Sequence, residues 1–343
     1  RELTTEEHER WDRFVASAPG GSIYAMARYL EVLCPVTDAT FRVVAGFRGD
    51  DLVGGVALYE RRNTAGVYVR PRLLLYYNGL VLAPPSSRYP SEAASLRIKL
   101  MVALDDWLSR QGYAHVCLKS RGDLTDVRPF LARGWTVEPA YTYEVGLGEP
   151  EAAYGRIERN FRRLIRRCEK EGFELVADGD FDTFFELHRA IHERKSAPIY
   201  LPRDRYRAYC GELRAKGLGR IYHVHAPDGK AAATQLVLLG PHPVCHTVCA
   251  GATSEHLNSG ASVFLRWKVM EALMAEGYRG NDLTDAALNK VTRFKSQLGG
   301  ELRLSLPVTR PSSLRWRALR QANAPRRFAR RAVRYAARRL RRR

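Results

Sequence analysis

The chain has 343 residues, 45% of them hydrophobic, and a formal net charge of +19 at pH 7. Its length predicts two domains or one large one. No uninterrupted apolar run reaches the roughly 18 residues of a membrane span, and no signal-peptide pattern opens the chain, so we expect a cytoplasmic protein.

The first 150 residues predict an α/β unit with alternating helices and strands. The expected helices are 6–16, 26–32 and a long amphipathic one at 92–110. The expected strands are 41–47 and 52–59, which form a hairpin around a turn at 49–51, and further strands at 73–82 and 113–119.

Residues 151–309 predict the same order of elements. The expected helices are 181–194, 203–215 and 262–275, and the expected strands are 221–225, 231–239, 244–251 and 281–283. Gly112-Tyr113 and Gly277-Tyr278 occupy the same place in the two halves, which indicates a duplication. We therefore predict domains at 1–150 and 151–309, followed by a tail at 310–343.

The positive charge is concentrated in that tail. Residues 310–343 contain fourteen arginines and no acidic residue, so only +5 of the +19 belongs to residues 1–309. From residue 325 on, the pattern predicts an amphipathic helix with an arginine face and a thin apolar face. Such a helix suits tRNA phosphates first and an anionic membrane surface second, which would place the protein peripherally at the inner membrane face. A basic segment without a dedicated partner is the third alternative.

The segment 242–249 is rich in cysteine and histidine, but its pattern does not predict a metal site. On a strand, Cys245 and Cys249 share one face while His246 points to the other. Because four ligands then do not converge on one ion, we predict no bound metal and small, reduced, buried cysteines.

A basic amphipathic helix is predicted at 156–170. Its apolar stripe runs from Ile157 to Cys168, and its other faces carry Arg159, Arg162, Arg163, Arg166, Arg167 and Lys170. Like charges at this spacing repel one another. The surface suits a phosphate-bearing partner such as tRNA, a nucleotide-sugar or a lipid-linked pyrophosphate, and a solvated surface without a partner is the alternative.

Lys295 falls on the apolar side of a short helix predicted near the end of the second half. At 100° per residue, one face carries Ala287, Leu288, Val291, Phe294 and Leu298, and Lys295 lies beside Leu288 and Val291. A lysine drawn toward the interior needs an anion or a carbonyl as partner. Alternatively, its stem packs while its ammonium group reaches water.

These segments resemble the FemABX-like transferases, which are tandem relatives of the GNAT acyltransferases. The resemblance is carried by Asp282-Leu-Thr-Asp285, Phe294-Lys295 and Leu298-Gly299 after the helix end at Gly277-Tyr278, and by the basic helix that begins near Arg159. It implies an α/β fold of two GNAT-like (acyl-CoA N-acyltransferase) halves in tandem. In each half, two neighbouring strands would splay apart, as they do in GNAT enzymes to admit an acyl donor.

The resemblance also bears on the donor. GNAT enzymes that use acyl-CoA bind its pyrophosphate on backbone amides of a glycine-rich loop at a helix N-terminus. Here Asn258, Ser259 and Gly260 are the candidate binding residues, but Leu257 stands where an Arg or Gln is usual, and the first-half loop 83–90 has three prolines and no glycine. We therefore expect no cofactor, and aminoacyl-tRNA rather than acyl-CoA as the donor.

By the same resemblance, Lys295 is predicted to stabilise negative charge that develops near the tRNA 3′ end. Asp282 is predicted to hold or deprotonate an amine acceptor, which could be a peptidoglycan precursor, a peptide or a small metabolite. A strand-end turn is the alternative role for Asp282. The predicted substrate-binding residues are Arg159, Arg163, Arg166, Arg167 and Phe294.

Two other functions stay open on the sequence. One is acyl-CoA-dependent N-acyl transfer in polysaccharide or lipid synthesis, which the loop at 258–262 supports. The other is a non-catalytic RNA- or membrane-binding protein that kept the fold. Both transferase functions predict that Lys295→Ala harms turnover more than binding, whereas the non-catalytic function predicts no effect.

Overall fold

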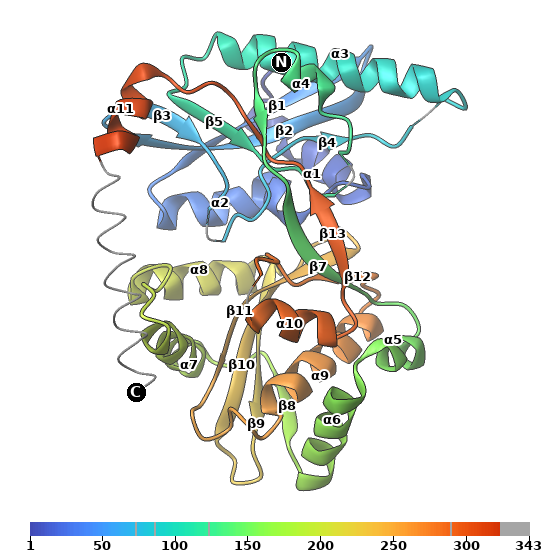
Figure 1. Cartoon of the computed structure of the whole chain (residues 1–343), viewed down its shortest axis with the longest axis vertical. Coiled ribbons are helices and arrows are strands. Elements are labelled where there is room, and N and C mark those ends of the chain that lie inside the picture. The colour runs from blue at the N-terminus through green and yellow to red at the C-terminus, as the bar shows by residue number, and fades with distance from the viewer. Residues whose placement is uncertain (73, 86, 123, 289, 323–343) are drawn as a thin grey trace.

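The computed structural model describes residues 1–322 apart from positions 73, 86, 123 and 289, so the helix predicted from residue 325 lies outside the described residues. Two mixed sheets, one above the other in Figure 1, form the two halves of the molecule. None of the described helices combines the length and hydrophobicity that a membrane span requires.

The first half contains the elements that precede residue 140. Its helices are α1 (His8–Ser17), α2 (Ala27–Val36), α3 (Pro90–Ser109) and α4 (Arg128–Leu131), with short 3-10 turns at Thr5–Glu7 and Ile23–Ala25. Its strands are β1 (Thr40–Arg48), β2 (Asp51–Asn63), β3 (Gly66–Val69), β4 (Val81–Leu82), β5 (His115–Leu118) and β6 (Thr136–Val137). The predicted hairpin is confirmed, because Arg48 pairs with Asp51 across the turn.

The strand predicted at 73–82 is wrong. The structure has β3 at Gly66–Val69 and only the short β4 at Val81–Leu82, with an irregular segment between them. In this segment the Asn78 side chain donates to the carbonyl of Cys117 and accepts from the amide of Lys119, and the amides of Asn78 and Gly79 donate to the Lys119 carbonyl. The apolar run that suggested a strand is instead a loop that carries Tyr76 and Tyr77 toward the second half.

The second half follows the predicted order closely. Its helices are α5 (Pro150–Arg156), α6 (Arg159–Glu171), α7 (Phe181–Arg194), α8 (Arg203–Ala215), α9 (Ala261–Ala275) and α10 (Lys290–Gln297). Its strands are β7 (Ala140–Gly146), β8 (Glu174–Ala177), β9 (Gly219–His225), β10 (Ala231–Leu238), β11 (Val244–Ala252), β12 (Gly280–Asp282) and β13 (Glu301–Ser305). The helix predicted at 156–170 is confirmed as α6 but begins at Arg159, because the backbone is extended at Ile157 and Glu158, and Arg156 ends the separate helix α5.

The two halves exchange strands beyond the boundaries expected from the sequence. β7, although it precedes residue 151, pairs with β12 and β13 in the second sheet. After β13 the chain returns to the first sheet, where β14 (Val308–Thr309) lies between β5 and β6. Helix α11 (Leu314–Ala322) then stacks the Trp316 ring on His115. The start of the predicted tail is therefore part of the first half.

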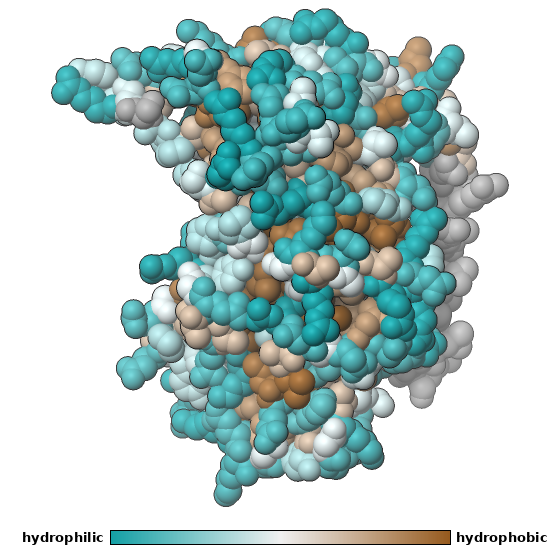
Figure 2. Space-filling view, turned by 180° about the vertical axis from the view of Figure 1, so that it is seen from behind, coloured by the Kyte–Doolittle hydropathy of each residue, from teal (hydrophilic) through white to brown (hydrophobic). Residues whose placement is uncertain are grey.

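A shared hydrophobic core joins the halves. Helix α2 of the first half packs against α8 of the second, residues of α1 and α7 belong to the same core, and the hydroxyls of Tyr29 and Tyr209 lie 2.8 Å apart within it. Separate cores lie on the outer faces, under α3 in the first half and under α6 and α9 in the second. Figure 2 shows the surface indented between the halves, beneath the projecting N-terminal end of α3.

Candidate active site at the interface between the two halves

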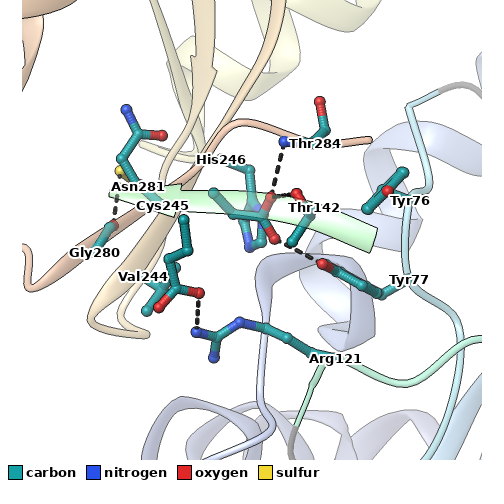
Figure 3. Close-up of polar contacts among 12 residues, drawn as sticks. Tyr76, Tyr77, Arg121, Thr142, Val244, Cys245, His246, Gly280, Asn281 and Thr284 are labelled. Atoms are coloured by element: carbon teal, nitrogen blue, oxygen red, sulfur yellow. Dashed lines mark hydrogen bonds and ion pairs between the residues drawn. The ribbon is translucent and has the colours of Figure 1, made fainter. Parts of the chain in front are cut away.

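Asp282 ends the short strand β12 and is completely buried, with an exposed fraction of 0%. Its carboxylate accepts hydrogen bonds from the Tyr77 hydroxyl (2.7 Å), the Thr142 hydroxyl (2.5 Å) and the Thr284 amide (2.8 Å). Figure 3 shows these three donors converging from the first-half loop, from β7 and from the chain after β12. A buried carboxylate needs such donors, because an unpaired buried charge is costly. Asp282 thus joins three separate segments.

The imidazole of His246 adds no charge to this group, although its Nδ1 lies 3.7 Å from Asp282. Burial lowers the pKa of His246 well below its usual value, so the ring is neutral. Burial and the neighbouring Asp282 raise the pKa of Tyr77, which keeps its hydroxyl protonated as a donor. Asp282 therefore acts here as an anchor for the surrounding chain.

Thr284 and Asp285 follow this anchor in the left-handed region, with φ values of 48° and 60°. Among the described residues they form the one consecutive pair of non-glycine residues in this conformation. A β-branched residue such as threonine adopts it at a steric cost, and such strain is often found at functional sites. The consequence is that both carbonyl groups turn toward α10.

Lys295 meets those two carbonyls. Its ammonium group donates to the carbonyl oxygens of Thr284 and of Asp285, the latter at 2.7 Å. Of the two partners that the sequence suggested for an inward-facing lysine, the structure shows the carbonyl. An ammonium group has three N–H donors, so one remains for a ligand.

The apolar face predicted around Lys295 is only partly correct. Helix α10 begins at Lys290, so Leu288 precedes the helix and is fully exposed, and Val291 is 45% exposed. Leu298 is buried, and the Phe294 ring packs against Phe161 of α6 with centroids 5.2 Å apart. Phe294 thus contacts α6, and this ring contact accounts for its half-buried position.

The surroundings of Lys295 are short of negative charge. Burial and the nearby Arg266 lower the pKa of Lys295 to about 8, although Asp285 and Asp282 act in the opposite direction. Arg266, on α9, has a buried Nη1 atom without a hydrogen-bond partner in the described part of the chain, and burial lowers its pKa to about 10. Two cations without an ion-pair partner in the described residues make this position favourable for an incoming negative charge.

A second lysine approaches from the first half, and sequence reasoning missed it. Lys119 follows β5 and is only 7% exposed. Its ammonium nitrogen lies 3.2 Å from the centroid of the Tyr76 ring, and no described acidic group lies within ion-pair distance. Burial lowers the pKa of Lys119 to about 8, opposed by the fields of Asp282 and Asp285. The charges of Asp282 and Asp285 therefore act on Lys119 as they do on Lys295.

The internal repeat is the sequence feature from which Lys119 could have been predicted. Lys119 stands seven residues after Gly112, and Thr284 stands seven residues after Gly277. The two positions thus follow equivalent strands, β5 and β12, on opposite sides of the interface.

Further contacts fix this interface: Arg121 pairs with Glu144 of β7 at 2.6 Å, and the Tyr76 hydroxyl donates to the Tyr141 carbonyl.

Comparisons with known proteins identify this architecture. Residues 155–296 match the acetyltransferase (GNAT) domain family. The whole fold is similar to the crystal structure of FemX, with 12% identity, a TM-score of 0.71, and coverage of 89% of this chain and 96% of FemX. The second half of the chain thus matches the GNAT domain family, and the whole chain has a fold similar to that of FemX.

Two further solved structures share the tandem GNAT fold. L-PGS from Bacillus licheniformis has 13% identity, a TM-score of 0.56, and coverage of 92% of this chain and 94% of that one. A tandem GNAT protein from the clavulanic acid biosynthesis pathway has 15% identity, a TM-score of 0.53, and coverage of 91% and 98%. No sequence among curated proteins matches the chain. The predicted fold of two GNAT-like halves is confirmed.

In this GNAT fold, the loop before α9 is where an acyl-CoA pyrophosphate would be expected. The carbonyls of Asn258 and Ser259 accept from the Arg167 guanidinium, and the Ser259 hydroxyl accepts from the amide of Ala261. Gly260 has φ of 98°, and a side chain there would meet Leu164 of α6. These contacts hold the loop against α6 and occupy one amide at the helix start.

Arg159, Arg163 and Arg166, which the sequence predicted to bind substrate, lie exposed on α6 and line a groove of about 520 Å³. The larger groove of about 1030 Å³ lies in the first half, between the β1–β2 hairpin and α3. It contains none of the residues around Lys295. We therefore assign the candidate site from side-chain geometry and not from the size of a groove.

Proposed function

We propose that the protein is an N-acyltransferase that moves an aminoacyl group from aminoacyl-tRNA to an amine acceptor. The observation that supports this best is the position of Lys295. It is held by two strained carbonyls at the interface between the halves and keeps one N–H donor for a ligand. Lys119, in the other half, is subject to the charges of Asp282 and Asp285, which also act on Lys295.

The proposed reaction is aminolysis of an ester. The acceptor nitrogen attacks the ester carbonyl carbon, an amide bond forms, and the bond from that carbon to the ribose oxygen breaks. The amine loses one proton, and the released ribose hydroxyl gains one, so the reaction needs no added oxidant or cofactor. Two tasks fall to the protein: holding the negative charge of the tetrahedral intermediate, and moving that proton.

Lys295 suits the first task, because its free N–H donor and the nearby Arg266 both favour developing negative charge. Lys119 suits the second. An amine with a pKa of about 8 is partly neutral near pH 7.5, so it can accept a proton and return it. Asp282 is a positioning residue in this scheme, since its carboxylate is buried and already accepts three hydrogen bonds.

The loop before α9 favours aminoacyl-tRNA over acyl-CoA as the donor. Pyrophosphate binding requires free backbone amides at a helix start, and the Ser259 hydroxyl already accepts from the Ala261 amide. Arg167, a cation that could meet a phosphate at this loop, donates instead to the carbonyls of Asn258 and Ser259.

Transfer assays with both donors test the proposal. Purified protein is incubated with radiolabelled aminoacyl-tRNA or with labelled acyl-CoA, and with a panel of amine acceptors. Amide formation should require aminoacyl-tRNA, and Lys295→Ala should abolish it, whereas the control Lys99→Ala, at an exposed position on α3, should not. Turnover of acyl-CoA without tRNA would refute the proposed donor.

A further inference from the structure

The outer face of α6 carries basic residues that no acidic residue neutralises. At 100° per residue, Arg159, Arg163, Arg166 and Lys170 fall within about 60° of the helix circumference. All four are exposed, and none forms an ion pair within the described residues. We call these four residues the basic stripe.

The acidic residues of this region are engaged elsewhere. Glu158 accepts from the Gln297 amide, Glu169 pairs with Lys268 at 3.0 Å, and Glu171 lies 3.5 Å from Arg167. Like charges four residues apart destabilise a helix. A stripe of this kind therefore weakens α6 unless a ligand neutralises it.

We propose that the basic stripe of α6 binds the phosphodiester backbone of RNA and directs the 3′ end of a tRNA toward Lys295. The inference rests on the proposed function for the identity of the RNA. The stripe is about 16 Å long, enough for several successive phosphates, and its N-terminal part lines the groove of about 520 Å³. Arginine guanidinium groups match phosphate geometry.

The position of the stripe supports this direction. The Glu158 amide donates to the Gln297 carbonyl at 2.9 Å, and the Phe161 ring contacts Phe294, so the N-terminus of α6 lies against α10. Lys295 lies on α10 only two residues before Gln297. An RNA strand that follows the stripe toward the start of α6 would therefore arrive beside the candidate active site.

The packing of α6 favours RNA over a membrane surface as the partner. A helix that lies on a lipid surface needs an apolar face for the acyl chains. The apolar face of α6, with Phe161, Ile165 and Cys168, is buried beneath the helix against the core that α9 shares. Figure 1 shows α6 beside α9 at the edge of the second half. The outer face thus offers charge without apolar area.

The test compares two triple variants that lose the same charge. The stripe variant is Arg159→Gln/Arg163→Gln/Arg166→Gln. The control variant, Arg48→Gln/Lys99→Gln/Arg214→Gln, removes three exposed cations that lie outside α6 and form no ion pair within the described residues. Glutamine keeps a helix propensity close to that of arginine. Binding of deacylated bulk tRNA is measured by fluorescence anisotropy at several salt concentrations, with the full chain in every protein.

The stripe variant should bind tRNA at least tenfold more weakly, and the slope of log affinity against log salt should fall by about 2 to 3. Its melting temperature should stay the same or rise, because repulsion is relieved. The control should bind like the wild type. Affinity within twofold of the wild type, or equal losses in both variants, would overturn the proposal, as would loss of binding to anionic phospholipid vesicles with tRNA binding intact.

A donor without the body of the tRNA distinguishes a failure of this inference from a failure of the proposed function. With an aminoacyl ester of adenosine, which cannot reach the stripe, the stripe variant should turn over as fast as the wild type, while KM for aminoacyl-tRNA rises about tenfold or more. If the wild type uses neither donor, the proposed function fails. The binding of deacylated tRNA would still decide the role of the stripe.

Discussion

Replacing Lys119 by methionine should stabilise the protein and impair catalysis at once. Lys119 is 7% exposed, and burial lowers its pKa from 10.5 to about 8. At 1.36 kcal/mol per pKa unit, holding the charge costs about 3 kcal/mol at pH 6. The cation–π contact with Tyr76, 3.2 Å from ring centroid to nitrogen, offsets about 1 to 2 kcal/mol. Methionine fills a similar volume, so Lys119→Met should gain about 1 to 2 kcal/mol.

The pH dependence of stability tests independently whether the charge on Lys119 destabilises the folded state. The folded-state pKa of Lys119 lies below the unfolded value, so the unfolded chain binds more protons between about pH 8 and 10.5. The penalty is full below pH 8 and fades as the pH rises toward 10.5. The advantage of Lys119→Met in urea denaturation should therefore be largest at pH 6 and shrink by pH 10.

The activity assay completes this prediction. Transfer should fall about 10²- to 10⁴-fold in Lys119→Met, the range of a lost general acid–base group, and the rise in rate toward pH 8 should disappear. A variant that is destabilised at pH 6 would show that the ammonium group stabilises the fold. A variant that transfers at the wild-type rate would show that Lys119 takes no part in the chemistry.

Three further outcomes are expected. Lys295→Ala should lower the single-turnover rate by about 10²- to 10³-fold with little change in tRNA affinity, since one oxyanion donor is lost, and a loss confined to affinity would contradict this. Asp282→Asn should lower the free energy of unfolding, measured by chemical denaturation, by roughly 2 kcal/mol. The reason is that the amide can accept fewer of the three hydrogen bonds that reach Asp282. An unchanged denaturation midpoint would argue against the anchoring role of Asp282. Tyr77→Phe removes one of those donors and should cost about 1 kcal/mol by the same assay, whereas an unaffected stability would mean that solvent replaces the hydroxyl.

The second half was predictable because its elements depend on local patterns. The helices at 181–194 and 203–215 and the strands at 221–225 and 231–239 appear where their hydrophobic patterns placed them. Lys295 could also be found, because its position on the apolar side of a helix departs from the local pattern. The partners that explain this position, the carbonyls of Thr284 and Asp285, depend on left-handed backbone that local patterns do not specify.

The first-half contribution to the site was not predictable in the same way. The apolar run around Tyr76 and Tyr77 has strand-like residues, but it is held by a few contacts of the Asn78 side chain and of the Asn78 and Gly79 amides with the end of β5 rather than by a strand ladder. Lys119 follows a strand like any exposed lysine, and its burial beside Tyr76 is visible only in the folded structure. Contacts between segments far apart in the chain decide both cases, and neither leaves a local signal.

The strand exchange fixes the two halves, and with them Lys119 and Lys295, relative to each other. β7 and β14 each pair within the sheet of the other half, so the halves cannot shift without breaking sheet pairing. Strained backbone on both sides, at Leu74 with φ of 66° and at Thr284 and Asp285, persists only where the surrounding structure determines it. Catalytic groups on such fixed elements keep their geometry before substrate arrives. The interface between the halves is therefore preorganised by topology, which suits the roles proposed for Lys119 and Lys295.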